Sequence, residues 1–108
     1  MNAILVLTTV DNPELAHRIA TALVEAGEAA CVSIVPGIRS IYRWEGKIRN
    51  EGELLLIIKS VAGRYEDVRS RIRQLHSYRV PEVIALTLTS GDHEYLHWLG
   101  AQVGMTDD

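Results

Sequence analysis

The sequence predicts an α+β fold in which an antiparallel sheet carries two main helices on one face. Strand-like and helix-like segments follow one another in the order β-α-β-β-α-β, and a short C-terminal helix follows them. Residues 30–60 have the composition of one very long β-hairpin, because β-branched and aromatic residues dominate both arms. With right-handed crossovers this order produces the ferredoxin-like sandwich. We therefore expect residues 1–108 to form a single domain of that type.

The first strand and the first helix are marked by clear local signals. Residues 3–10 form an apolar run that is apolar on both faces of a strand. Asn12 is a good N-cap, Pro13 suits the first helical position, and Gly27 suits the end of the helix. The stripe that should face the core recurs every fourth residue and consists of Leu15, Ile19 and Leu23.

The predicted hairpin is too long for the body that carries it. Glu45-Gly46 marks its turn, because glycine adopts positive φ angles without a Cβ clash. Each arm has about 14 residues and spans about 45 Å at about 3.3 Å per residue, whereas a globule of this length has a radius of gyration of about 13 Å. The hairpin should therefore project, and its exposed edges should pack against another copy of the chain.

Two glycine-containing pairs interrupt the alternation within the hairpin arms. These pairs are Pro36-Gly37 in the first arm and Glu51-Gly52 in the second. Strand-forming residues resume after each pair, so we expect bulges or bends rather than strand ends.

The second half of the chain repeats the helix and strand signals. A helix is expected from Gly63 to Leu75, and residues 83–88 form the fourth strand. The buried stripe of the helix consists of Tyr65, Val68, Ile72 and Leu75. Asp92 caps the C-terminal helix, and the chain is expected to fray from Gly100.

The first, third and fourth strands are apolar on both sides, although two helices can cover only one face of the sheet. The second face would expose on the order of several hundred Å² of apolar surface to water. Soluble monomers rarely expose a contiguous apolar patch of that size. This face and the projecting hairpin both predict oligomerisation, and a ring with cyclic symmetry satisfies both.

Composition limits the classes of partner. The net charge is −3 and the sequence pI is about 5.8, which argues against nonspecific nucleic-acid binding. The single cysteine, Cys31, cannot form an internal disulfide, and no secretory leader opens the chain. No apolar run approaches the roughly 20 residues of a membrane span. We expect a soluble cytoplasmic protein that binds neither membranes nor nucleic acid.

Two metal-binding patterns are present. His93-Glu94-Tyr95-Leu96-His97 matches the H-E-x-x-H pattern of zinc peptidases. No His or Glu follows it to serve as a third ligand, so adventitious binding of nickel or copper is the better interpretation. Cys31 begins a core strand and is either a small buried hydrophobe or a soft ligand for Cu(I).

Two clusters carry groups suited to ligand binding, and no catalytic triad, phosphate loop or paired-carboxylate pattern accompanies them. At the hairpin tip, Lys47 should pair with Trp44 and Arg49 with Tyr42, either stabilising the ribbon or forming one wall of a pocket. The second cluster lies in the loop before the last strand, with Lys59 nearby, and consists of His76, Tyr78 and Glu82. This loop is either a polar turn or part of a binding site.

The chain resembles the CutA divalent-cation tolerance family. The resemblance spans nearly the whole chain and rests on ordered motifs that include Ala30-Cys31-Val32, Pro36-Gly37-Ile38, Trp44-Glu45-Gly46-Lys47-Ile48 and Val80-Pro81-Glu82.

The resemblance implies a homotrimer, similar in architecture to the PII signalling proteins, whose hairpins pack across neighbouring copies. It also implies a role in tolerance of divalent metals, copper above all, with no catalytic activity and no cofactor needed for folding. The implied ligand site is the cleft between subunits, formed by Trp44, Glu45, Lys59, Tyr78 and Glu82. The implied metal ligands are Cys31 and His76. The alternative is a PII-like sensor that binds a small molecule and acts on a protein partner.

Overall fold

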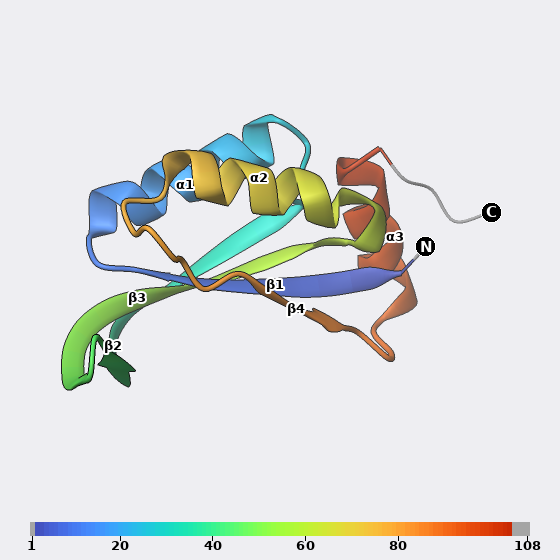
Figure 1. Ribbon diagram of the computed structural model, residues 1–108. Coiled ribbons are helices and arrows are strands. Elements are labelled where there is room, and N and C mark those ends of the chain that lie inside the picture. The colour runs from blue at the N-terminus through green and yellow to red at the C-terminus, as the bar shows by residue number, and fades with distance from the viewer. Residues whose placement is uncertain (1, 105–108) are drawn as a thin grey trace.

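The computed structural model describes residues 2–104. In chain order the elements are β1 (Ala3–Val10), α1 (Pro13–Glu25), β2 (Cys31–Trp44), β3 (Lys47–Val61), the 3₁₀ turn η1 (Ala62–Arg64), α2 (Tyr65–Leu75), β4 (Ile84–Thr87) and α3 (His93–Gln102). The strands form one antiparallel sheet in the order β2-β3-β1-β4. Figure 1 shows α1 and α2 side by side over one face of this sheet. The predicted ferredoxin-like arrangement is confirmed.

Alternation along the strands separates a covered face from an open face. On β1, Val6, Thr8 and Val10 are fully buried beneath the helices. Leu5 and Leu7 point to the other face and are only partly buried. The core under the helices also takes the predicted stripes of α1 and α2, which confirms both helical faces.

The open face leaves its apolar side chains only partly covered. The C-terminal helix α3 covers only one end of it, where Leu99 and Val103 pack on Val61 (Figure 1). Elsewhere on this face the described residues provide no second layer, and Leu86 of β4 is 48% exposed. The sheet therefore has the two-sided apolar character that the sequence predicted.

The long hairpin has the predicted length and turn. Its arms have 14 and 15 residues, and the molecule measures 49 × 25 × 22 Å. Glu45 and Gly46 have φ angles of 51° and 77°, the geometry of a type I′ turn. Trp44 pairs with Lys47 and Tyr42 with Arg49, as predicted. The far ends of β2 and β3 bend away from the helices (Figure 1).

One of the two predicted irregularities is a bulge and the other is not. Val35 pairs with Leu55 and Ile38 with Glu53, so two residues of β2 oppose one residue of β3. Gly37, within this bulge, has a φ of 75°. This finding confirms the bulge at Pro36-Gly37.

At Glu51-Gly52 the strand continues, as predicted, but the bulge alternative is wrong, because the pairing there is regular. Gly52 instead leaves room for a side chain of the opposite strand. A Cβ atom at residue 52 would lie 3.2 Å from Nη1 of Arg39. The Arg39 guanidinium donates from Nε to Asn50 Oδ1 over 3.1 Å and thus crosses the ribbon.

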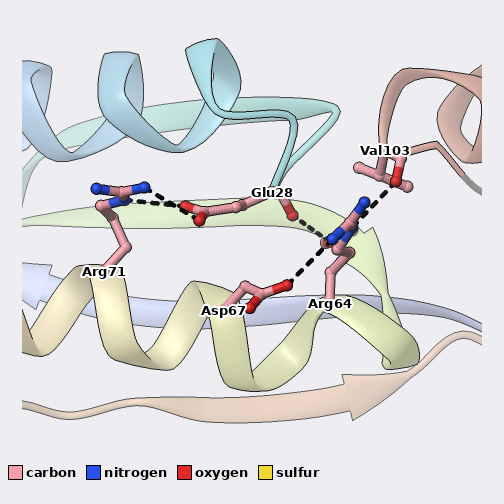
Figure 2. A network of polar contacts seen from close by, with 6 residues as sticks. Glu28, Arg64, Asp67, Arg71 and Val103 are labelled. Carbon is pink, nitrogen blue, oxygen red and sulfur yellow. Dashed lines mark hydrogen bonds and ion pairs between the residues drawn. The ribbon is translucent and has the colours of Figure 1, made fainter.

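The prediction of fraying from Gly100 is wrong for the described residues. α3 continues to Gln102, and both Gly100 and Val103 are buried. Figure 2 shows Arg64, whose Nε donates to the carbonyl oxygen of Val103 over 3.0 Å. This contact holds the end of α3 against the start of α2. Residues 105–108 of the predicted frayed tail lie outside the described residues.

A second arginine fastens the loop after α1 to α2. Arg71 donates from Nε and Nη2 to the two carboxylate oxygens of Glu28 over 3.0 and 3.1 Å (Figure 2). The hydroxyl of buried Ser60 donates to the Glu28 carbonyl oxygen over 2.6 Å. These bonds position Glu28 between β3 and α2 and rigidify this end of the sandwich.

Candidate functional site

A cavity of about 610 Å³ lies on the open face of the sheet and extends along the projecting hairpin as far as Trp44. The hairpin and β1 form one side of it, and the loop between α2 and β4 forms the other. Its lining residues are Thr9, Ser40, Ile41, Tyr42, Trp44, Glu53, Tyr78, Arg79, Val80 and Glu82. Aromatic and acidic side chains thus meet where residues 2–104 place no second layer on the sheet.

The bulge decides which side chains of β2 face this cavity. Before the bulge, Val35 pairs with Leu55 on the open face. The extra residue shifts the alternation by one, so that Ile38 pairs with Glu53 on the same face. Tyr42 and Trp44 follow at even spacing and therefore face the cavity instead of Arg43.

His76 anchors the loop that forms the opposite wall. Its Nδ1 accepts a 3.0 Å hydrogen bond from the backbone N–H of Tyr78. The acceptor role of Nδ1 places the ring proton on Nε2, which donates to the carbonyl oxygen of Thr9 over 2.8 Å. The ring centroids of His76 and Tyr78 are 4.6 Å apart. Neutral His76 therefore ties the loop to β1 and directs Tyr78 toward the hairpin.

Tyr78 and Glu53 join the two walls. The Tyr78 hydroxyl donates to Glu53 Oε2 over 2.6 Å. Burial of the phenol, reinforced by this bond and by the negative charge of Glu53, raises the pKa of Tyr78 well above its usual value of 10.0. The tyrosine is therefore a neutral donor at physiological pH, and Glu53 is its acceptor.

A cation already lies against the aromatic wall. The guanidinium carbon of Arg79 lies 5.9 Å from the centroid of the Trp44 ring, within the range of a cation–π interaction. Glu82 lines the same cavity and is exposed to solvent. The charged groups of the lining are thus two carboxylates and one guanidinium, which leaves the cavity acidic.

The structure brings together three of the five residues proposed for the ligand cleft. Trp44, Tyr78 and Glu82 line the cavity. Glu45 occupies the exposed hairpin turn. Lys59 lies farther along the open face, where its Nζ donates to Ser33 Oγ over 2.9 Å. Within one chain, Glu45 and Lys59 are not part of this cavity.

The two proposed metal ligands lie apart. Cys31 Sγ is 3.7 Å from Lys59 Nζ, and Lys59 pairs with Leu5 of β1. His76 contacts Thr9, four residues along the same strand, which is about 13 Å at about 3.3 Å per residue. Among residues 2–104 no group of three His, Cys, Asp or Glu side chains is arranged to hold a metal ion, and this includes His93 and His97.

Glu53, like Arg79, is a charged residue of the lining that no sequence motif indicated. It lies on β3 next to Gly52 and has the strand neighbours of an ordinary surface glutamate. Its side chain is nevertheless only 6% exposed. The one available signal was its position on the open face, two residues before Leu55.

The part of the chain that the structure describes contains no helix long and apolar enough to cross a membrane.

Comparison with known proteins identifies the family. Residues 4–102 match the model of the CutA1 divalent ion tolerance protein. The divalent-cation tolerance protein CutA of Thermus thermophilus is 48% identical over 99 residues, which cover 92% of this chain and 96% of the relative.

Solved structures of related proteins are also similar to this chain. CutA1 from Oryza sativa superposes with a TM-score of 0.92 at 41% identity, covering 100% of this chain and 96% of that one. The periplasmic divalent cation tolerance protein CutA from Archaeoglobus fulgidus superposes with a TM-score of 0.91 at 36% identity, covering 94% of this chain and 98% of that one. Sequence and structure agree that this chain belongs to the CutA1 divalent ion tolerance family.

Proposed function

We propose that the protein is a non-enzymatic homotrimer that contributes to tolerance of divalent cations, copper above all. In this proposal it binds metal or a small ligand in clefts between its subunits and acts in the cytoplasm. The observation that carries the proposal is the acidic, aromatic cavity on a sheet face that the described part of the chain leaves without a second layer. The family name, which refers to tolerance of ions and not to a reaction, supports the same function.

Apolar exposure on both sides of the hairpin supports assembly. Ile41 and Ile48 lie on the face of the ribbon opposite the Tyr42 and Trp44 side chains, and are 69% and 63% exposed. The other face continues into the open apolar sheet. A ribbon with apolar side chains on both faces is suited to insertion between neighbouring copies.

A tight metal site requires more donors than one chain gathers. Within residues 2–104 no cluster of three suitable side chains exists. The cavity carboxylates, Glu53 and Glu82, supply hard oxygen donors, and Cys31 supplies a soft donor for Cu(I). His76 can take part only by releasing Thr9 or Tyr78, since both of its ring nitrogens are hydrogen-bonded. Donors from two copies would complete a coordination shell.

Calorimetric titration of the purified protein with Cu(II), and with Cu(I) under reducing conditions, tests the metal-binding part. Stoichiometric binding is expected, and Cys31→Ser, His76→Gln or Glu82→Gln should weaken it. His17→Gln, which changes an exposed histidine of α1 outside the cavity, is the matched control and should leave the affinity unchanged. Equal affinity in the first three variants would reject those residues as ligands.

Tolerance itself is tested in cells. A bacterial strain that lacks its own CutA homologue should regain growth on copper when it expresses this chain. Variants that bind copper normally should restore growth, and variants that do not bind it should fail. Full rescue by non-binding variants would show that tolerance does not depend on metal capture.

The alternative function is a PII-like sensor that passes a small-molecule signal to a protein partner. The cavity itself favours it, because aromatic walls with few polar groups are typical of sites for organic ligands. A thermal-shift screen of metabolites should then find a stabiliser whose effect is lost in Tyr78→Phe and Glu82→Gln. If only metal ions shift the melting temperature, the sensor hypothesis is wrong.

A further inference from the structure

Glu53 is a buried carboxylate that lacks a cationic partner. Its side chain is 6% exposed, and among the described residues no Lys, Arg or His forms an ion pair with it. The Tyr78 hydroxyl donates to Oε2. Oε1 has no hydrogen bond within the described residues and is not one of their buried atoms without a partner, so it is open to the cavity. A buried charge without a counter-charge is unfavourable. The cavity therefore offers a negative site that a cationic hydrogen-bond donor would stabilise.

The walls around Glu53 suit the organic part of such a cation. Tyr42, Trp44 and Tyr78 present aromatic rings, and Val80 adds aliphatic surface. Aromatic faces attract cations through their quadrupoles, and the Arg79 guanidinium over Trp44 shows that this wall accommodates one. A hydrated metal ion would gain nothing from these apolar surfaces.

We propose that the cavity binds a primary organic ammonium ion, whose N–H groups donate to Glu53 Oε1 and whose carbon chain packs against the Trp44 and Tyr42 rings. This inference rests on the proposed function in one respect, since it takes the same cavity as the ligand site. Organic anions are disfavoured by Glu53 and Glu82, and neutral ligands leave the charge of Glu53 unbalanced.

The volume of the cavity and its second carboxylate extend the proposal to diamines. About 610 Å³ leaves room for a chain longer than a single ammonium head. Glu82 lines the outer part of the cavity and is exposed, so it can pair with a second ammonium group. An exposed pair contributes less than a buried one, and the main recognition therefore stays at Glu53.

Three four-carbon probes that differ only in the head group test the charge requirement. Calorimetry should show that n-butylammonium binds, whereas 1-butanol and butyrate do not. The diamine 1,4-diaminobutane should bind about threefold more tightly than n-butylammonium, the gain expected from one exposed pair. Equal binding of 1-butanol, or tighter binding of butyrate, would overturn the proposal, as would no binding of either amine.

Matched variants locate the site. Glu53→Gln keeps the shape and an acceptor for Tyr78 but removes the charge, and should weaken n-butylammonium binding by about tenfold or more. Glu51→Gln changes an exposed glutamate two residues away on the same arm, outside the cavity, and should have no effect. Trp44→Leu should weaken binding by about threefold through loss of the packing between the indole ring and the carbon chain of the ligand. Equal losses in Glu53→Gln and Glu51→Gln would contradict the assigned position.

Separate measurements test whether the variants are folded and whether the metal function persists. Circular dichroism and the melting temperature of Glu53→Gln show whether the variant is folded. If it is not folded, a quenching experiment tests the same contact. In a Trp98→Phe background that keeps Trp44, n-butylammonium should protect the Trp44 fluorescence from a neutral quencher. Absence of protection overturns the proposal. Copper titration and cell growth test the metal function independently, so amine binding can fail while copper binding persists, and the reverse.

Discussion

The hydroxyl of Tyr78 lies 2.6 Å from the carboxylate of Glu53, although 25 positions separate the two residues in the chain. This bond closes the cavity between the projecting hairpin and the loop before β4. It pairs a partly buried phenol that stays protonated with a buried carboxylate that accepts its hydrogen bond. The contact couples the orientation of the hairpin to that of the loop.

Tyr78 should ionise later than a free tyrosine. Its raised pKa means that the folded state holds this proton above the unfolded value of 10.0. The stability that the neutral phenol contributes is therefore present below that pH and is lost as the pH rises above it. Ultraviolet titration should show one of the four tyrosines ionising late in the native protein. Tyr78→Phe should remove that late step, and persistence of the step would assign it elsewhere.

Glu45→Asn should stabilise the hairpin turn. Glu45 has a φ of 51°, a conformation that costs a residue with a Cβ atom about 1–2 kcal/mol and that asparagine tolerates better. Urea denaturation should show a free energy of unfolding higher by about 0.5 kcal/mol. Glu51→Asn, in the regular part of the arm, should bring no gain. A similar gain at both positions would mean that charge and not turn geometry is responsible.

Deletion of Pro36 should reverse which side chains of β2 face the cavity. The bulge sets two residues of β2 against Leu54, and removal of one restores one-to-one pairing. Every later side chain of β2 then changes face, and Trp44 leaves the cavity. In a Trp98→Phe background the fluorescence of Trp44 should become more accessible to a neutral quencher. Unchanged quenching would indicate that the strand re-forms its bulge at another residue.

Leu86→Glu should disrupt assembly, whereas Val24→Glu should not. In the single chain the two side chains are similarly exposed, at 48% and 45%. If the chain acted alone, both changes would have small effects on stability. If the open face is an interface, a glutamate at residue 86 places an unpaired charge within it.

Sedimentation distinguishes these cases. The wild type and Val24→Glu should sediment with about three times the 12.0 kDa mass of the chain, and Leu86→Glu should shift toward the monomer. A folded wild-type species at the mass of one chain would exclude the trimer. Loss of assembly in both variants would point to a general effect of added charge.

Local patterns were sufficient for most of the fold. The spacing of Leu15, Ile19 and Leu23 predicted the face of α1, and Asn12 was correctly placed as its cap, with Oδ1 accepting from Leu15 N over 2.7 Å. Such features depend on neighbours within one or two turns, so the sequence contains them directly.

Features that depend on distant residues were not predictable in the same way. Gly52 has the local signature of a bulge, but it lies in a regularly paired strand. Its missing side chain leaves room for Arg39 from the opposite arm. Gly100 has the signature of a fraying end, but Arg64 holds Val103 from 39 positions away. In both cases a side chain from another element changed the outcome.

The sequence by itself determined the order of the elements, the length of the hairpin, the position of its turn at Glu45-Gly46 and the presence of two apolar sheet faces. These properties follow from side-chain periodicity and from the conformational freedom of glycine, which act over a few residues. Only the tertiary structure decided that Glu53 is buried, that it meets Tyr78, and that Glu45 and Lys59 lie elsewhere. The physical reason is that burial and charge pairing depend on which strands and loops meet in space, and a one-residue bulge determines which side chains they present.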